Sequence, residues 1–271
     1  MPELPEVETT LRGVRPYVVG QVIKTVVVRQ RHLRVPVTHG LESRLQNQVV
    51  RSVGRRAKYL LFQFDFGTLS VHLGMSGRLR VVPVDLPPEK HDHFELVFEH
   101  GVCLRLRDPR RFGQVLWLGT RPLESKWLKH LGPEPLDPDF NGDYLYRQAR
   151  SRKVAVKNFI MDGRIVVGVG NIYASEALYL AGIHPSRAAG RISLKRYHQL
   201  CTSIEQVLRA AIKAGGTTLR DYMSIDGRAG YFEQELHMYG REGFPCPHCG
   251  TTIKRRIIGQ RSTFYCATCQ R

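Results

Sequence analysis

The chain has 271 residues, of which 42% are hydrophobic and 9% aromatic, as expected for a folded protein. Its charge is unusual, because 41 Lys and Arg residues against 24 Asp and Glu residues leave a formal net charge of +17. This balance favours a polyanionic partner, most often nucleic acid, over the alternative of a merely solvated basic surface. The sequence has no apolar run of membrane-spanning length and no leader-like N-terminus, so we expect a cytoplasmic protein without a membrane partner.

The first eight residues, Met-Pro-Glu-Leu-Pro-Glu-Val-Glu, contain an unusual chemical possibility. Removal of Met1 would leave the nitrogen of Pro2 as a free secondary amine, which can attack an electrophilic carbon and form a cationic iminium. Apolar residues recur at helical spacing over residues 4–14, which predicts a helix that begins within this stretch. The alternative is an ordinary amphipathic helix whose first turn holds Pro and Glu for helix propensity alone.

Short β-strands are predicted from about residue 21 to residue 118. Segments rich in Val, Leu and Phe alternate there with turns that contain Gly or Pro, a pattern typical of an antiparallel β-sandwich. The predicted strands are Val22–Arg29, Lys58–Phe66, Leu69–Leu73, Leu79–Val82, Phe94–Phe98, Val102–Leu106 and Val115–Leu118.

A segment rich in Pro, Gly and Asp, residues 132–142, predicts a linker. Beyond it the apolar spacing becomes helical, and residues 217–231 resemble a long loop. The predicted helices are Asp143–Arg150, Val154–Met161, Asn171–Leu180 and Ser193–Ala214. The fold class is therefore α+β, with a sandwich over residues 1–131, a helical domain over residues 143–236 and a small unit over residues 237–271.

Two C-x-x-C pairs, Cys246/Cys249 and Cys266/Cys269, have the spacing of a structural four-cysteine zinc site. A redox-active dithiol is the alternative. The residues between the pairs predict a β-hairpin with Gly259-Gln260 near its tip, from which Arg261 would project toward a phosphate.

The run Gly168-Val-Gly-Asn171 directly precedes a predicted helix. Glycines at a helix start let the backbone approach an anion closely, and Lys153 and Lys157 could add phosphate contacts. The alternative is that Asn171 is simply the N-cap of that helix.

Two turns in the sandwich present apolar side chains beside basic ones. One turn contains Met75, and the other contains Arg110 and Phe112. Such side chains can wedge between bases, although Met75 or Phe112 could instead lie in the core.

Further basic residues lie elsewhere in the predicted sandwich. The segment Arg55–Lys58 is expected to begin a strand, so that at least one of its cations faces a functional cleft. His91 and His93 could contact phosphate or could simply occupy a loop.

With MPELPEVE, RRAKYL, HLGMSG, DPRRFG, GVGNIYASE and the paired cysteines in this order, the chain resembles the formamidopyrimidine-DNA glycosylase family over essentially its whole length. The resemblance implies an N-terminal β-sandwich, a helix–two-turn–helix domain with a lesion-capping loop at residues 217–231, and a zinc finger. It implies a monomeric base-excision repair enzyme that binds damaged duplex DNA, with one structural zinc ion and no redox cofactor. The implied substrates are 8-oxoguanine and formamidopyrimidines, and strand cleavage would follow by β,δ-elimination.

The resemblance also implies roles for individual residues. Pro2 would attack C1′ of the damaged nucleotide and Glu3 would transfer protons to and from the sugar. Lys58 would donate a proton in β-elimination, and Arg261 would act in the second elimination. The implied DNA contacts are His91, Arg110, Arg152, Lys157, Asn171 and Arg261, with Met75, Arg110 and Phe112 filling the space left by the flipped base. Arg152 matches a basic position of the family rather than an invariant residue.

Two other functions remain possible. An endonuclease VIII-like enzyme would use the same Pro-Glu start on oxidised pyrimidines, although Leu4 and the long loop after Thr217 favour the first family. A non-catalytic zinc-ribbon protein would explain the charge and the cysteines but not Pro2, Glu3 and Lys58. Such a protein would bind DNA in a salt-sensitive manner without cleaving it.

Overall fold

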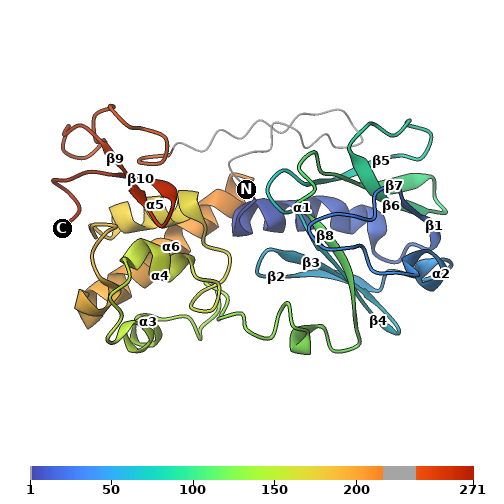
Figure 1. Cartoon of the computed structure of the whole chain (residues 1–271), viewed down its shortest axis with the longest axis horizontal. Helices are drawn as coiled ribbons and strands as arrows, with labels where there is room; N and C mark the ends of the chain where they lie inside the picture. Colours follow the sequence, from blue (N-terminus) through green and yellow to red (C-terminus); the bar gives the residue numbers. More distant parts are fainter. Residues whose placement is uncertain (1, 216–235) are drawn as a thin grey trace. The chain divides into compact units, whose positions relative to one another are not determined.

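The computed structural model describes residues 2–215 and 236–271 (Figure 1). The described residues divide into two compact units, residues 2–129 and residues 130–214 with 236–271. The predicted loop at residues 217–231 lies outside the described residues. Within the described ranges, no helix combines the length and the apolar character needed to span a membrane.

The first unit is the expected antiparallel sandwich preceded by a helix (Figure 1). One four-stranded sheet has the order β1-β6-β7-β5 and the other has the order β2-β3-β4-β8. The helices are α1 (Leu4–Val18) and α2 (Leu41–Leu45), with a 3-10 turn η1 at Pro122–Glu124. The strands are β1 (Ile23–Val28), β2 (Ser52–Arg56), β3 (Tyr59–Phe64), β4 (Gly67–His72), β5 (Arg78–Pro83), β6 (Asp92–Phe98), β7 (Val102–Arg107) and β8 (Gln114–Gly119).

Helix α1 packs into the same hydrophobic core as both sheets. Val7, Val14 and Val18 lie on its buried stripe and are 0% exposed. Inward-facing residues of the strands, such as Phe62 and Phe94, complete this core. Burial of this stripe against the sandwich therefore fixes the N-terminal residues to the first unit.

The prediction that Arg55–Lys58 begins a strand is wrong. Arg55 and Arg56 end β2, and Ala57, with φ of 53°, and Lys58 form the turn to β3. Strand β2 was missed because it contains Gly54 and two arginines and buries only Val53 fully. Lys58 therefore lies on a hairpin turn.

The second unit contains the predicted helices and the C-terminal hairpin. The helices are α3 (Gly142–Ala149), α4 (Val156–Met161), α5 (Asn171–Leu180) and α6 (Leu194–Lys213), with a 3-10 turn η2 at Ala189–Arg191. Strands β9 (Lys254–Ile258) and β10 (Arg261–Tyr265) pair antiparallel. Gly259 and Gln260 both have positive φ, 55° and 61°, which is the backbone of a two-residue hairpin turn. The predicted hairpin and its tip are thus confirmed.

Candidate active site and nucleic-acid interface

The start of α1 places two buried carboxylates beside Pro2. Glu3 is the N-cap residue and is 2% exposed, and Glu6 is 6% exposed. The two residues form a reciprocal capping box, in which Oε2 of Glu6 accepts a hydrogen bond from the Glu3 amide at 2.8 Å. Pro2 is half-buried directly before this cap. The capping box therefore fixes the backbone at Glu3, the candidate proton-transfer residue, which directly follows the candidate nucleophile Pro2.

An ion pair joins α1 to the turn that carries Lys58. Nε of Arg55 lies 3.1 Å from Oε2 of Glu8 on α1. Nη1 of Arg55 also donates to the carbonyl oxygen of Ala57 at 2.8 Å. Arg55 therefore holds the Lys58 turn and α1 together within the first unit.

His72 lies beside this turn in a strongly cationic environment. Burial, together with the charges of Lys58 and Arg34, lowers the pKa of His72 to about 4. Its Nδ1 accepts a hydrogen bond from the Gly74 amide at 3.0 Å. The imidazole is therefore neutral at neutral pH, and its remaining proton lies on Nε2.

The two candidate wedge turns expose their apolar side chains. Met75 is 40% and Phe112 is 38% exposed, which argues against the alternative that they belong to the core. The guanidinium of Arg110 lies 4.8 Å from the centroid of the Phe112 ring. An arginine stacked on an exposed ring presents a flat surface that suits a nucleobase.

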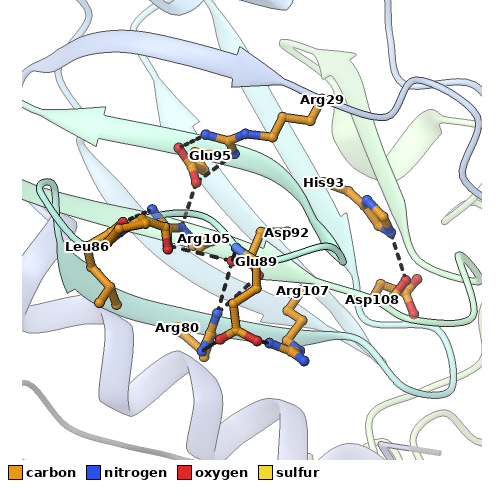
Figure 2. Close-up of polar contacts among 11 residues, drawn as sticks. Arg29, Arg80, Leu86, Glu89, Asp92, His93, Glu95, Arg105, Arg107 and Asp108 are labelled. Atoms are coloured by element: carbon orange, nitrogen blue, oxygen red, sulfur yellow. Dashed lines mark hydrogen bonds and ion pairs between the residues drawn. The ribbon is translucent and has the colours of Figure 1, made fainter.

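A buried network of charged side chains, which no motif of the sequence predicted, supports the loop before β6 (Figure 2). Arg105 on β7 is 2% exposed, with its Nε 2.6 Å from Oε1 of Glu95. Its Nη2 donates to the carbonyl oxygen of Leu86 at 2.9 Å. Asp92, which is 1% exposed, accepts a hydrogen bond from Nη2 of Arg80 at 3.0 Å. In the sequence, this network is indicated only by charged residues at strand positions whose side chains face inward.

The two histidines that flank Asp92 differ in their surroundings. His93 is 7% exposed and its Nε2 lies 3.0 Å from the carbonyl oxygen of Asp108. Burial lowers the pKa of His93. His91 is half-buried, and its carbonyl oxygen accepts a hydrogen bond from the Asp108 amide at 3.0 Å. His93 is therefore a buried structural residue, whereas His91 keeps the partial exposure that a phosphate contact requires.

In the second unit, Lys157 and Asn171 meet strand β10. Nζ of Lys157 donates to Oδ1 of Asn171 at 2.6 Å and to Oγ1 of Thr263 at 2.7 Å. The Nδ2 of Asn171 donates to the carbonyl oxygen of Ser262 at 3.1 Å. Lys157 is 0% exposed, so direct contact with a phosphate would require its ammonium to leave these acceptors.

The predicted alternative for Asn171 is wrong, because Gly170 is the N-cap of α5 and Asn171 is its first helical residue. Its side chain bonds to β10 and α4 in place of its own helix start. Lys153 lies outside α4 and is exposed, whereas Lys157 lies on α4 and is buried, so of the two lysines only Lys153 is open to a phosphate in this structure.

The hairpin and the segment before α4 present cations at the surface. Arg261 is exposed at the first position of β10, next to the turn. Lys254, Arg255 and Arg256 are exposed along β9. Arg152 is also exposed, with its Nε donating to the carbonyl oxygen of Gln148 at 2.8 Å. These side chains are available to a polyanion, and their individual contacts stay predictions.

Glu176, which no motif of the sequence predicted as a functional residue, anchors the segment that leads into the hairpin. It is 4% exposed, and its carboxylate accepts hydrogen bonds from the amides of His237, Met238 and Tyr239 at 2.8–2.9 Å. Since Glu176 and Asn171 both lie on α5, this helix holds the segment that leads into the hairpin and also strand β10 at Ser262.

The four predicted metal ligands come together. The Sγ atoms of Cys246, Cys249, Cys266 and Cys269 all lie within 4.8 Å of one another. Two of the separations are 3.9 Å for Cys246–Cys269 and 3.5 Å for Cys249–Cys266. Four thiolates at the usual Zn–S distance of about 2.3 Å have sulfurs roughly 3.8 Å apart, so the cluster fits a tetrahedral zinc ion.

Comparisons with known proteins match the whole chain. Three family profiles match: the formamidopyrimidine-DNA glycosylase N-terminal domain over residues 1–115, the formamidopyrimidine-DNA glycosylase H2TH domain over residues 131–223, and the zinc finger found in FPG and IleRS over residues 243–271. Formamidopyrimidine-DNA glycosylases from Syntrophotalea carbinolica and Alkalilimnicola ehrlichii are 59% and 56% identical to it, with 100% of each chain covered.

Solved structures are similar over the same length. Fpg of Lactococcus lactis, in a complex with DNA that contains an abasic site, has 34% identity and a TM-score of 0.91, with 99% of both chains covered. MutM (Fpg) of Thermus thermophilus has 38% identity and a TM-score of 0.86, with 99% of this chain and 98% of the other covered. The zinc-finger match and the sulfur cluster together assign the four cysteines to one structural zinc ion. On the evidence of its motifs, its fold and these relatives, the chain belongs to the formamidopyrimidine-DNA glycosylase family.

Proposed function

We propose that this protein excises 8-oxoguanine and formamidopyrimidines from duplex DNA and then cleaves the strand at the abasic site. Membership of a DNA glycosylase family supports the proposal, as do the complexes of Lactococcus lactis Fpg with abasic-site DNA and Fapy-dG DNA. The observation that carries it is the buried Glu3 carboxylate next to Pro2 at the start of α1. This arrangement pairs an amine nucleophile with a carboxyl group that can carry protons.

The first stage forms a covalent intermediate at the sugar. After removal of Met1, the lone pair of the Pro2 nitrogen attacks C1′ as the glycosidic bond breaks, and the damaged base leaves with the proton that the attacking N–H group gives up. Glu3 gives a proton to the ring oxygen O4′, the C1′–O4′ bond breaks, and the opened sugar remains on Pro2 as an iminium. The cationic iminium accepts electrons in the next stage.

The second stage cleaves the strand. The iminium acidifies C2′, whose proton is lost as the 3′ phosphate leaves, and Lys58 supplies a proton in this β-elimination. A second elimination, assigned to Arg261, removes the C4′ proton as the C5′–O bond breaks and the 5′ phosphate leaves. Hydrolysis of the iminium then frees Pro2. This sequence needs no change of oxidation state, and the zinc ion has the structural task of holding the hairpin that carries Arg261.

Recognition of the duplex combines charge with insertion into the base stack. The net charge of +17 supports binding to the phosphate backbone. Met75, Arg110 and Phe112 fill the space that the flipped base leaves. The phosphate contacts are assigned to His91, Arg110, Arg152, Lys157, Asn171 and Arg261.

The proposal also includes the domain boundaries and the cellular location of the protein. The boundaries are a catalytic sandwich at residues 1–131, a linker at 132–142, a DNA-binding helical domain at 143–236 and a zinc finger at 237–271. The protein acts as a monomer in a bacterial cytoplasm, where its substrate DNA lies in the nucleoid.

Borohydride trapping on an 8-oxoguanine:cytosine duplex tests the chemistry. The wild type is expected to yield a covalent adduct, whereas Pro2→Gly and a form that retains Met1 are expected to lose it. A thymine glycol duplex run in parallel tests the endonuclease VIII-like alternative, which predicts faster excision of the pyrimidine. A protein with intact zinc and a free Pro2 that binds the duplex but gives neither adduct nor cleavage would contradict the proposal and favour a DNA-binding module.

A further inference from the structure

The carboxylate of Asp108 connects two loops of the first unit. Asp108 is 0% exposed. Its Oδ1 accepts a hydrogen bond from Oγ of Ser76 at 2.7 Å, and its Oδ2 accepts one from the amide of Gly113 at 2.6 Å. Hydrogen bonds to an ionised carboxylate are stronger than those between neutral groups, so each loop is firmly held.

The groups that Asp108 holds are next to the exposed wedge side chains. Ser76 follows Met75, and Gly113 follows Phe112. The Oγ of Ser76 also accepts a hydrogen bond from the Arg110 amide at 3.2 Å. Met75 and Arg110 are therefore one bond from Ser76, along the chain and through a hydrogen bond respectively. Phe112 is linked to Asp108 through its neighbour Gly113.

The two loops also touch through their backbones. Gly74 has φ of 63°, and a Cβ at this position would lie 2.3 Å from the carbonyl carbon of Phe112. Such a separation leaves no room for any side chain, so the loops meet at backbone distance. Small displacements of one loop are thereby transmitted to the other.

Asp108 is itself anchored to the start of β6 (Figure 2). Its amide donates to the carbonyl oxygen of His91, and its carbonyl oxygen lies 3.0 Å from Nε2 of His93. Between these histidines, Asp92 is fixed by Arg80. The carboxylate therefore has a rigid base in the sheet from which it can hold both loops.

We propose that Asp108, acting through Ser76, is a positioning residue that makes the Met75 loop and the Arg110–Phe112 loop one rigid wedge. The inference rests on the proposed function, in which these side chains replace the flipped base. Separating stacked bases costs free energy. A flexible loop therefore inserts between the bases less well than a loop that is held rigidly. The Asp108–Ser76 contact is therefore most important for extrusion of a stacked base. It is less important at an abasic site, which has no base to unstack.

The test compares Ser76→Ala with the matched control Ser52→Ala. Ser52 lies in the same sandwich and donates to Oε1 of Gln63 at 2.7 Å, so its variant loses a hydroxyl hydrogen bond of equal length elsewhere. Stopped-flow fluorescence of 2-aminopurine beside 8-oxoguanine reports base extrusion. Single-turnover excision of 8-oxoguanine and cleavage of an abasic-site duplex are measured on the same proteins.

Ser76→Ala is expected to slow base extrusion and 8-oxoguanine excision at least about tenfold, the lower limit for the loss of one hydrogen bond to a charged group, with abasic-site cleavage near the wild-type rate. Ser52→Ala should match the wild type in all three assays. Asp108→Asn should be milder than Asp108→Ala, because its amide can still accept from Gly113 and donate to Ser76. Equal losses on both substrates, or no difference between Ser76→Ala and Ser52→Ala, would overturn the inference.

Phe112→Ala separates this inference from the proposed function. If Phe112→Ala slows extrusion while Ser76→Ala does not, the wedge stands and the positioning role of Asp108 is overturned. If Phe112→Ala also leaves extrusion unchanged, the wedge itself fails and the inference falls with it.

Discussion

Nζ of Lys157 lies 2.6 Å from Oδ1 of Asn171, and both side chains also reach the carbonyl oxygen of Ser262 in β10. Helices α4 and α5 are thereby tied to the strand that begins with Arg261. Because Lys157 is 0% exposed, it stabilises the hairpin at least as directly as it could bind a phosphate. The position of the exposed Arg261 depends on this buried contact.

Lys157→Met is expected to destabilise the protein by about 2–4 kcal/mol, because it leaves buried acceptors on Asn171 and Thr263 without their charged donor. Urea unfolding measures this loss. The matched variant Lys153→Met removes an exposed lysine nearby and should stay within about 0.5 kcal/mol of the wild type. Similar unfolding midpoints for the two variants would contradict a structural role for Lys157.

Removal of zinc is expected to unfold the hairpin while the sandwich stays folded. The hairpin has a small core of its own, built around Met238, Ile253 and Phe264, whereas the sandwich has a separate and larger core. Hydrogen exchange after chelation should show loss of protection over residues 254–265 and retained protection over β3 and β6. Added zinc should restore the protection. Unchanged exchange in the hairpin after complete removal of zinc would contradict this expectation.

Patterns that are local in the sequence predicted the structure well. The spacing of the cysteines and the Gly259-Gln260 tip predicted a zinc-bearing hairpin, and the apolar spacing predicted Asn171–Leu180 as a helix with its observed bounds. These features depend on residues that are close in the chain, where turn preferences and helical periodicity apply.

Features that depend on long-range pairing were not predicted. Arg105 meets Glu95 because β6 and β7 pair in a particular register, which no local pattern reveals. The N-cap interpretation of Asn171 is wrong because its hydrogen-bond partner Ser262 lies 91 residues away, where no local pattern can reveal it. The hydrogen bond between Ser76 and Asp108 is long-range in the same way, since it joins two motifs that lie apart in the sequence.

Stability should depend on pH through His72. Its pKa is lowered to about 4 in the folded chain by burial and by the charges of Lys58 and Arg34. Between that value and the ordinary pKa of about 6.5, the unfolded chain binds a proton that the folded chain does not, so stability falls as the pH falls through this range. Above about pH 6.5 the contribution of the neutral imidazole is fully present.

Urea unfolding of the wild type and His72→Gln measures this effect. Between about pH 7 and about pH 5, the free energy of unfolding should fall by about 2 kcal/mol more in the wild type than in the variant. Only the wild type has an imidazole at residue 72 that binds a proton on unfolding. The glutamine retains an acceptor for the Gly74 amide. Parallel losses in the two proteins would show that His72 does not resist protonation.

Glu3→Gln should separate the cap of α1 from the chemistry of its carboxylate. The glutamine keeps an oxygen that can accept the hydrogen bond from the Glu6 amide, so the capping box and the melting temperature should change little. It cannot carry a proton, so single-turnover excision should fall by about a hundredfold or more. The matched variant Glu6→Gln changes the other carboxylate of the box, which accepts from the Glu3 amide, and should keep most of the activity. If the two variants lose excision equally while remaining folded, the buried carboxylate of Glu3 acts through the helix cap alone and has no direct part in proton transfer.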